Sequence, residues 1–324
     1  MAESTTDVDQ SLLLERMELI RRFETRVGEL FADNEIPGFV HLYIGSEAVA
    51  VGACSALEES DYITSTHRGH GHALAKGLDP KKMMAELYGR TTGYCNGKGG
   101  SMHIADVDAG MLGANGIVAA GTPIGGGAAL ASQIRGDGDV AVSFLGDGAT
   151  SNGPYHEALH LAALWDLPQI YVVENNHYGE MTSVHDQHPV SDLVKQADAY
   201  DVPGEIVNGQ DVEEMYEASQ EAVERARDGD GPTVIEAKTY RYKGHYEGDP
   251  QWYKENEDLP DWRTADPVET YSEKLIDAGV ISEDEYEELG ESIEKELDEA
   301  VEFAKDSPLP EPDAAYEGLY AEEL

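Results

Sequence analysis

Two apolar runs and the helical pattern between them stand at the centre of the chain. Residues 140–145 are almost wholly apolar and end in a Gly-Asp-Gly turn at 146–148, as expected of a strand buried on both faces of a parallel sheet. Apolar residues then recur at three- and four-residue steps until Pro168, the spacing of a buried helix face. Residues 170–173 form a second apolar run, followed by Glu-Asn-Asn at 174–176. The pattern predicts a βαβ unit with polar side chains after each strand.

Further elements follow the same two periodicities. The pattern predicts strands over residues 205–208 and 233–238, with an acidic helix over 212–227 between them. Near the start of the chain, an apolar stripe predicts a helix over residues 11–33 with Ser11 as its N-cap. Three more helices are expected, the first rich in small residues and the last opened by a capping box of Ser282 and Glu285: 48–57, 267–278 and 282–305.

The alternation of strands and helices indicates a doubly wound α/β fold, with a mostly parallel sheet flanked by helices. We expect this domain to occupy residues 36–260. Residues 1–35 would form an N-terminal helical extension, and residues 261–324 an acidic helical extension packed on the same domain. In such folds ligands bind at the carboxyl ends of the strands, so the polar groups after each strand should converge there.

Acidic residues dominate the charge balance. The 324 residues include 65 Asp and Glu against 22 Lys and Arg, a formal net charge of −43. This charge argues against nucleic acid and anionic membranes as partners. Because apolar periodicity persists along the chain, we interpret the acidity as a surface adapted to high salt, where screening removes self-repulsion. We expect a salt-adapted source organism and poor stability at low salt.

Cysteine usage and hydropathy point to an intracellular setting. Cys54 and Cys95 are the only cysteines and neither belongs to a CxxC pair, so no disulfide framework or zinc site is expected. No apolar stretch approaches transmembrane length. The acidic N-terminus lacks the basic and apolar regions of a signal peptide. We therefore expect a cytoplasmic protein.

The Gly-Asp-Gly turn carries the strongest chemical signal. Glycine-rich turns after strands hold phosphates through backbone N–H groups, but a carboxylate beside a diphosphate is repelled unless a divalent cation lies between them. Mg²⁺ prefers oxygen ligands and shares them with phosphates, and Asp147 and the Asn pair at 175–176 supply such oxygens. A lone Gly-Asp-Gly would suit an Asp that caps the next helix, whereas the Asn pair favours the metal–diphosphate site. A nicotinamide-binding fold would need a G-x-G-x-x-G turn after a strand, and the sequence has none.

Residues 66–72, Thr-His-Arg-Gly-His-Gly-His, form a second dense polar cluster. Three histidines within six residues are compatible with a metal site. Arg68 lies among them, however, and a fixed cation disfavours a metal ion and suits a phosphate. We therefore favour phosphate binding, with metal ligation as the alternative.

Two glycine-rich segments indicate close approach to a ligand. Residues 113–127 are too rich in small residues for a simple core helix, and glycine lets a backbone approach a ligand closely. Their later part, 125–129, suits a tight helix–helix crossing. Residues 240–250 follow the last predicted strand and combine Gly, aromatic and charged residues as in a lid.

Together these motifs resemble one family. Gly-Asp-Gly followed by Asn-Asn is similar to the thiamine-diphosphate motif. ENNHYG, HRGHGH, GKGGSMH and GANGIV resemble the α subunit of the thiamine-diphosphate-dependent dehydrogenase component of 2-oxoacid and acetoin dehydrogenase complexes. The resemblance runs from the first helix to the final tail. It implies a thiamine-diphosphate-binding fold that carries the diphosphate-binding half of an active site.

The resemblance also implies a set of site residues. Asp147, Asn176 and the backbone carbonyl of Tyr178 would hold Mg²⁺, and Arg68 would contact the cofactor diphosphate. The whole cofactor-binding set that it implies is His41, His67, Arg68, Gly116, Val118, Asp147, Gly148, Ala149, Asn176, Tyr178 and His245.

Roles follow for individual members of this set. Gly116 would meet the aminopyrimidine through its backbone, and Val118 would be an apolar wedge that bends the cofactor. His67, His70 and His245 are the candidates for proton transfer, because histidine pKa values lie near neutral pH. Related sequences often carry Tyr where His67 stands.

The resemblance implies an enzyme that cleaves acetoin or decarboxylates a 2-oxoacid and transfers the acyl group to a lipoyl group. Its partners would be a β subunit, which supplies a Glu that activates the aminopyrimidine in an α2β2 assembly, and a lipoyl acyltransferase core. The loops GHYEGDPQ and STHRGHGHALAKG are most similar to the acetoin branch. A pyruvate or branched-chain 2-oxoacid dehydrogenase α subunit is the alternative enzyme, and a catalytically idle scaffold subunit is the alternative of another class.

Overall fold

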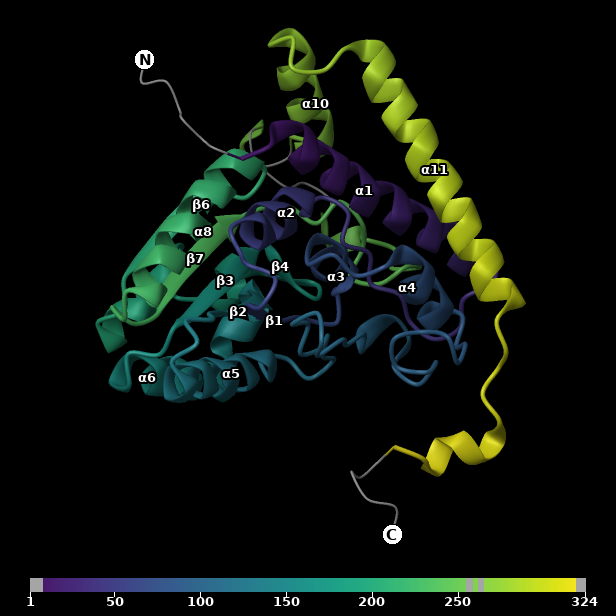
Figure 1. Ribbon diagram of the computed structural model, residues 1–324. Coiled ribbons are helices and arrows are strands. Elements are labelled where there is room, and N and C mark those ends of the chain that lie inside the picture. Colours follow the sequence, from purple (N-terminus) through teal and green to yellow (C-terminus); the bar gives the residue numbers. More distant parts are fainter. Residues whose placement is uncertain (1–7, 255–258, 262–264, 319–324) are drawn as a thin grey trace.

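Five parallel strands form the central sheet of the computed structural model, which describes residues 8–254, 259–261 and 265–318 (Figure 1). The strands lie in the order β1 (Tyr62–Thr64), β2 (Ala141–Gly146), β3 (Gln169–Asn175), β7 (Thr233–Lys238) and β6 (Gly204–Asn208). The outer ends of the two predicted terminal extensions, residues 1–7 and 319–324, lie outside the described residues.

Side chains of the central strands alternate between two buried clusters. On β2, Val142 and Phe144 point into one cluster, whereas Ala141 and Leu145 point into the other. Successive residues of a strand face opposite sides, so a strand covered on both sides is apolar at nearly every position. This confirms the interpretation of the central apolar runs as doubly buried parallel strands.

Helices cover both faces of this sheet (Figure 1). One face carries α5 (Gly121–Arg135), which packs on β1, β2 and β3, with α6 (Gly153–Leu164) beside it. The other face carries α8 (Val212–Arg227), which packs on β3, β6 and β7, with α2 (Glu47–Ser55) against it. The predicted doubly wound α/β fold with a mostly parallel sheet is confirmed.

The first and last helices lie together at one side of the molecule (Figure 1). Helix α1 (Gln10–Ala32) packs on α2, α10 (Pro267–Asp277) and α11 (Glu283–Asp306). The remaining elements are short: α3 (His70–Ala75), α4 (Pro80–Leu87), the hairpin of β4 (Tyr178–Gly179) and β5 (Thr182–Ser183), α7 (Val184–Gln187), and 3₁₀ turns at Gly100–Met102, Asp147–Ser151, Leu193–Tyr200, Trp252–Lys254 and Pro312–Tyr316. No described helix is both long enough and apolar enough to cross a membrane.

The two predicted helix caps have different outcomes. Ser282 accepts from the backbone N–H of Glu285, whose side chain returns to the backbone of Ser282, so the predicted capping box is confirmed. The prediction of Ser11 as the N-cap of the first helix is wrong. Asp9 is the cap, because its carboxylate accepts from the N–H groups of Ser11 and Leu12, and Asp performs this role at least as well as Ser.

The small residues at 125–129 approach the sheet as well as a helix. A Cβ added at Gly125 would lie 2.2 Å from Oγ of Ser143 on β2 and 3.1 Å from Nε2 of Gln169 on β3. The glycine is therefore needed for the approach of α5 to the sheet, which the prediction of a helix–helix crossing did not include.

Candidate functional site

A cavity of about 450 Å³ opens at the carboxyl ends of β2 and β3. Loops that follow β1, β2, β3 and β7 build its walls, in agreement with the ligand position expected for parallel sheets. Of the residues that the sequence predicts for the site, all but His70 line this cavity: His41, His67, Arg68, Gly116, Val118, Asp147, Gly148, Ala149, Asn176, Tyr178 and His245.

The Gly-Asp-Gly turn lies where β2 ends and a 3₁₀ turn begins. Asp147 is 1% exposed, and its backbone oxygen accepts a 2.9 Å hydrogen bond from Oγ1 of Thr150. A Cβ at Gly148 would lie 3.1 Å from the Cα of Gly179. The glycine thus lets the β4–β5 hairpin approach the turn, which places Tyr178 and Asp147 in the walls of the same cavity.

The structure separates the two members of the Asn pair. Asn175, the last residue of β3, is buried and its Nδ2 donates to Oε1 of Glu236 at 2.7 Å. Asn176 lines the cavity, and its Oδ1 accepts a 3.3 Å hydrogen bond from the backbone N–H of Tyr178. Oxygen-bearing groups of Asp147, Asn176 and Tyr178 therefore meet in one cavity, while Asn175 belongs to the core.

Two guanidinium groups stand in the same walls. Arg68 is buried and donates to the carbonyl oxygens of Leu42, at 2.6 Å, and His245, at 2.8 Å. Burial, together with the charge of Arg241, lowers the pKa of Arg68 to about 9. At neutral pH both groups are cationic, so the cavity offers two positive charges to an anion.

Arg241 was not predicted from the sequence. Its Nη2 donates to the carbonyl of Glu180 at 2.7 Å and to the hydroxyl of Tyr253 at 2.8 Å. Tyr253 in turn donates to Oδ2 of Asp249, which accepts from the backbone N–H of His245 at 2.7 Å. This network joins the β4–β5 hairpin to the loop after β7. In the sequence this network is indicated by nothing more than a single Arg after a predicted strand.

Glu174 also lines the cavity and was not predicted. It lies at the end of β3, where its Oε1 accepts from the hydroxyl of Tyr43 and is 3.2 Å from Nε2 of His72. Oγ of Ser65 lies 2.7 Å from Nδ1 of the same histidine. The sequence could have indicated Glu174 as a site residue, because it stands directly before the Asn pair at the end of a predicted strand.

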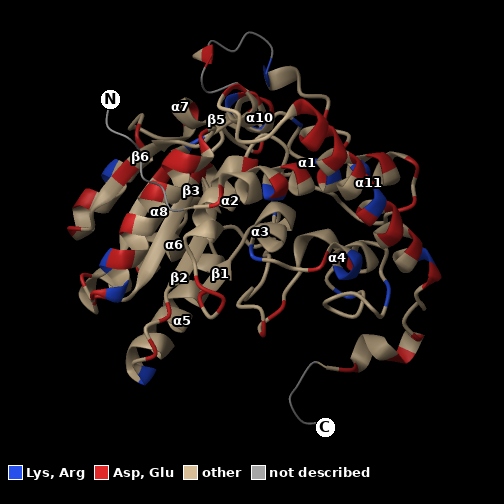
Figure 2. Ribbon diagram, turned by 45° about the horizontal axis from the view of Figure 1, so that its top comes forward, with Lys and Arg blue, Asp and Glu red and all other residues tan. Residues whose placement is uncertain are grey.

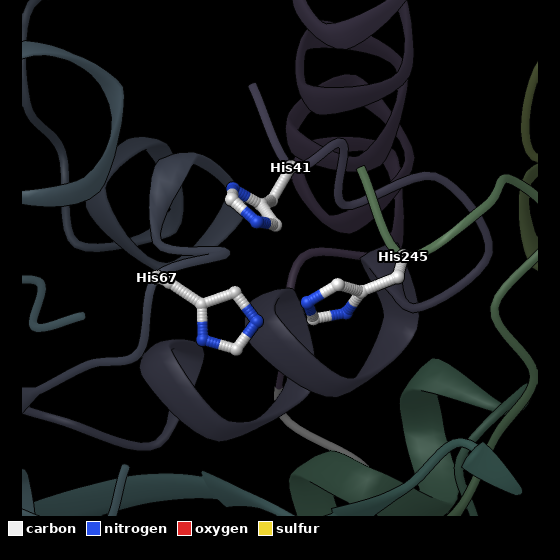
Figure 3. Close-up of side chains that lie close together, drawn as sticks. All are labelled: His41, His67 and His245. Atoms are coloured by element: carbon white, nitrogen blue, oxygen red, sulfur yellow. The ribbon is translucent and has the colours of Figure 1, made fainter. Parts of the chain in front are cut away.

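Three imidazoles that line the cavity lie close together (Figure 3). The ring of His41 lies 4.8 Å from that of His67 and 5.1 Å from that of His245, measured between centroids. Burial, followed by the charge of Arg68, lowers the pKa of His41 to about 3, of His67 to about 2 and of His245 to about 4. The three rings are therefore neutral at pH 7.

His70 occupies a different place from its neighbours in sequence. It opens α3 and is fully buried, with Nδ1 at 3.1 Å from Oε2 of Glu24 and Nε2 at 2.9 Å from Oγ of Ser101. It is not among the described residues that line the cavity. Proton transfer by His70 stays a prediction, and its contacts join α1, α3 and the 3₁₀ turn at Gly100–Met102.

Gly116 and Val118 lie at the rim of the cavity. Val118 is 46% exposed and its neighbour Ile117 is 71% exposed, which is unusual for large apolar side chains beside a binding site. A Cβ at Gly116 would lie 3.3 Å from Cε1 of His103. The rim therefore exposes apolar surface and backbone at the cavity, and the predicted contacts of Gly116 and Val118 with a cofactor stay predictions.

Comparison with known proteins finds matches over nearly the whole chain. A family model described as dehydrogenase E1 component matches residues 15–313. Subunit alpha of acetoin:2,6-dichlorophenolindophenol oxidoreductase from Bacillus subtilis (strain 168) is 49% identical over 311 residues, covering 95% of this chain and 92% of that protein. The subunit of the same name from Cupriavidus necator is 45% identical, over 94% of this chain and 92% of that one. Pyruvate dehydrogenase E1 component subunit alpha from Rickettsia bellii is 40% identical, over 94% and 93%.

The family match covers nearly the whole chain, from residue 15 in α1 to residue 313, and includes every segment that lines the cavity. The chain therefore belongs to the dehydrogenase E1 component family, as an α subunit of the thiamine-diphosphate-dependent oxidoreductases that act on oxo groups in 2-oxoacid or acetoin dehydrogenase complexes.

Proposed function

We propose that this chain is the α subunit of an acetoin-cleaving dehydrogenase component that uses thiamine diphosphate with Mg²⁺ and passes the acyl group to a lipoyl group. The observation that carries the proposal is the meeting of Asp147, Asn176 and Tyr178 with two arginines in one cavity. The acetoin branch is favoured because relatives of that name are 49% and 45% identical, against 40% for a pyruvate dehydrogenase subunit.

The donor set fits the cofactor and its metal. A carboxylate, an amide oxygen and a backbone carbonyl are ligands that Mg²⁺ accepts while it keeps phosphate oxygens and water. Arg68 and Arg241 complement the remaining charge of a diphosphate. Backbone groups of Gly148 and Ala149 lie in the same wall. In this proposal Asp147, Asn176 and the carbonyl of Tyr178 hold the metal, and thiamine diphosphate, when bound, supplies the electron sink for breaking the bond next to the carbonyl.

The chain's own residues would position the substrate and handle protons. Among the described residues, Nδ1 of His41 and Nδ1 of His245 have no hydrogen-bond partner although both are buried. A negatively charged ligand in the cavity would raise the pKa of these imidazoles from about 3 and about 4 toward the neutral range. The same ligand would raise the pKa of His67, which is lowered to about 2 in the empty cavity. His245 and His67 would then be able to hold a proton near the reacting carbonyl, while Val118 excludes water at the rim.

The proposal of a partner subunit is supported by a surface that is largely free of charge on an otherwise acidic protein. Asp and Glu crowd α8 and α11, whereas α5 and α6 are largely free of charge (Figure 2). Contiguous exposed apolar side chains mark interaction sites, and this face exposes Ile117, Val118, Ile124, Ile134, Leu161, Leu164 and Trp165. We propose that a β subunit covers the rim of the cavity and contributes the Glu that activates the aminopyrimidine, in an α2β2 assembly that serves a lipoyl acyltransferase core.

The test is a dye-reduction assay in molar KCl with thiamine diphosphate and Mg²⁺, on the chain alone and with its candidate β subunit. Acetoin, pyruvate and branched-chain 2-oxoacids are offered in parallel. Activity that needs the partner and prefers acetoin supports the proposal. Preference for a 2-oxoacid moves the chain to the alternative branch, and cofactor binding without turnover on any substrate favours the idle scaffold subunit.

A further inference from the structure

Three histidines from distant parts of the sequence form a compact cluster. His41 lies between α1 and α2, His67 between β1 and α3, and His245 in the loop after β7. One ring nitrogen from each lies within 4.8 Å of the others, and Figure 3 shows the three rings turned toward a common centre. The histidines that the sequence brings together, at 67, 70 and 72, are a different set, and the structure separates them.

The cluster is open toward a ligand. Within the part of the chain that the structure describes, Nδ1 of His41 and Nδ1 of His245 have no hydrogen-bond partner, so each has a lone pair or a proton to offer. The neutral ring is the form that binds metal ions, and burial beside Arg68 keeps the pKa of all three imidazoles below neutrality. All three residues line the cavity, which leaves room for a further ligand.

We propose that, when the cavity holds no cofactor, His41, His67 and His245 bind a divalent transition-metal ion such as Zn²⁺, with a fourth coordination position open to the cavity. Zn²⁺ prefers tetrahedral sites, and bonds of about 2.0–2.1 Å to imidazole place the ligand nitrogens roughly 3.4 Å apart. The nitrogens must therefore approach one another by on the order of 1 Å, which rotations about the side-chain bonds supply. This site is additional to the oxygen ligands proposed for Mg²⁺, because an all-imidazole set suits Zn²⁺ or Co²⁺ rather than Mg²⁺.

Charge in the cavity decides whether a cation can enter. Arg68 and Arg241 oppose it, but the guanidinium of Arg68 is held by the carbonyl oxygens of Leu42 and His245. The walls also contain three carboxylates, those of Asp147, Glu174 and Glu180, which outnumber the two arginines. The surrounding protein carries a formal net charge of −43, so cations accumulate around it at low ionic strength.

The proposal is tested by titrating Co²⁺ into the full chain, without an affinity tag, thiamine diphosphate or Mg²⁺. Tetrahedral Co²⁺ absorbs visible light far more strongly than octahedral Co²⁺, so the spectrum reports the geometry of the site. We expect a tetrahedral spectrum at one bound ion, abolished by Zn²⁺. His67→Tyr, which keeps a planar ring, and His245→Gln should each weaken binding by at least about 10-fold.

Two control variants locate the ion. His156 and His160 stand one turn apart on α6 and could capture an ion themselves, so His160→Gln should leave the Co²⁺ spectrum unchanged. Asp147→Asn removes the carboxylate of the proposed Mg²⁺ set; it should lower the affinity for Co²⁺ through the lost charge but keep the tetrahedral shape of the spectrum. An octahedral spectrum, or a tetrahedral spectrum that survives both His67→Tyr and His245→Gln, would overturn the proposal. Circular dichroism verifies that each variant is folded.

Discussion

Two groups of histidines, one in the cavity and one in the core, show how the same side chain serves different ends in this protein. In the cavity, His41, His67 and His245 face one another, and two of them have an Nδ1 without a hydrogen-bond partner among the described residues. In the core, His70 lies between Glu24 and Ser101, and His72 between Ser65 and Glu174, with both ring nitrogens of each within hydrogen-bond distance of a partner.

The difference comes from the start of a helix. His67 precedes α3 and is in the loop after β1, whereas His70 and His72 belong to α3, which is buried along its length. A buried imidazole needs partners for its nitrogens, because an unsatisfied polar group costs free energy. Histidines in the core are therefore saturated, and those at the cavity keep capacity for a ligand. A dense histidine motif in a sequence can contain both kinds.

The largest expected effect is on turnover in the cavity group. His245→Gln removes an imidazole that we place beside the substrate, and loss of a positioned proton-transfer group lowers kcat by about 100- to 10,000-fold. The melting temperature should change little, since the side chain of His245 faces the cavity. The measurement is steady-state kinetics of the assembled enzyme, with His160→Gln, an exposed histidine, as the matched control. Full activity in the His245 variant would remove it from the reaction.

Substitution of a histidine in the core group should lower the free energy of unfolding instead. His70→Leu leaves the carboxylate of Glu24 and the hydroxyl of Ser101 buried without this partner, and such losses cost about 1–3 kcal/mol each time a buried polar group is left unsatisfied. Urea unfolding followed by circular dichroism measures the change, and Ser101→Ala should cost less because the imidazole keeps Glu24. An unfolding free energy equal to that of the wild type would show that the core network is not stabilising.

Acid should lower the free energy of unfolding through His67 of the cavity group. The pKa of His67 in the folded protein is about 2, below the ordinary value near 6.5 of an unfolded chain. Its contribution to stability is therefore complete above about pH 6.5 and falls as the pH decreases, by at most about 1.4 kcal/mol per pH unit. Urea unfolding between pH 7 and pH 5 should show a smaller loss in His67→Tyr than in the wild type. Parallel losses would contradict the neutral state of this partly buried ring.

Salt should raise the melting temperature of the whole protein but leave the difference between the wild type and His70→Leu unchanged. With a net charge of −43, screening by KCl should raise the melting temperature of every variant. The difference between the wild type and His70→Leu should stay constant, because the His70 network is buried and little screened. Melting curves over a KCl series measure both quantities. A melting temperature that does not rise with KCl would count against a surface adapted to high salt.

Much of the fold could be predicted from the sequence because its central strands contain nearly continuous apolar runs. The runs at 140–145 and 170–173 correspond to β2 and β3, and the predicted strands at 205–208 and 233–238 to β6 and β7. The edge strand β1 was not predicted, since three residues carry too short a pattern. The N-cap of α1 was misplaced by two residues because Asp9 and Ser11 are both good caps.

The candidate site was predicted as a set of residues but not as a network. The motifs at strand ends predicted that Asp147 and Asn176 lie together, because parallel strands end at the same edge of the sheet, and both line the cavity. The hydrogen bonds from Arg241 through Tyr253 to Asp249 depend on how two loops fold over the hairpin, which periodicity does not encode. The separation of Asn175 from Asn176, and of His70 from His67, likewise depends on the direction of single side chains.

We propose that Asp147 holds a metal-bound diphosphate in this cavity, and calorimetric titration of thiamine diphosphate measures that role. The wild-type protein, Asp147→Ala and Asp108→Ala, which removes an exposed carboxylate in a loop, are each titrated with and without Mg²⁺ in molar KCl. We predict Mg²⁺-dependent binding in the wild type and in Asp108→Ala, and none in Asp147→Ala. Equal affinity for thiamine diphosphate in the wild type and Asp147→Ala would show that Asp147 does not hold the metal-bound diphosphate.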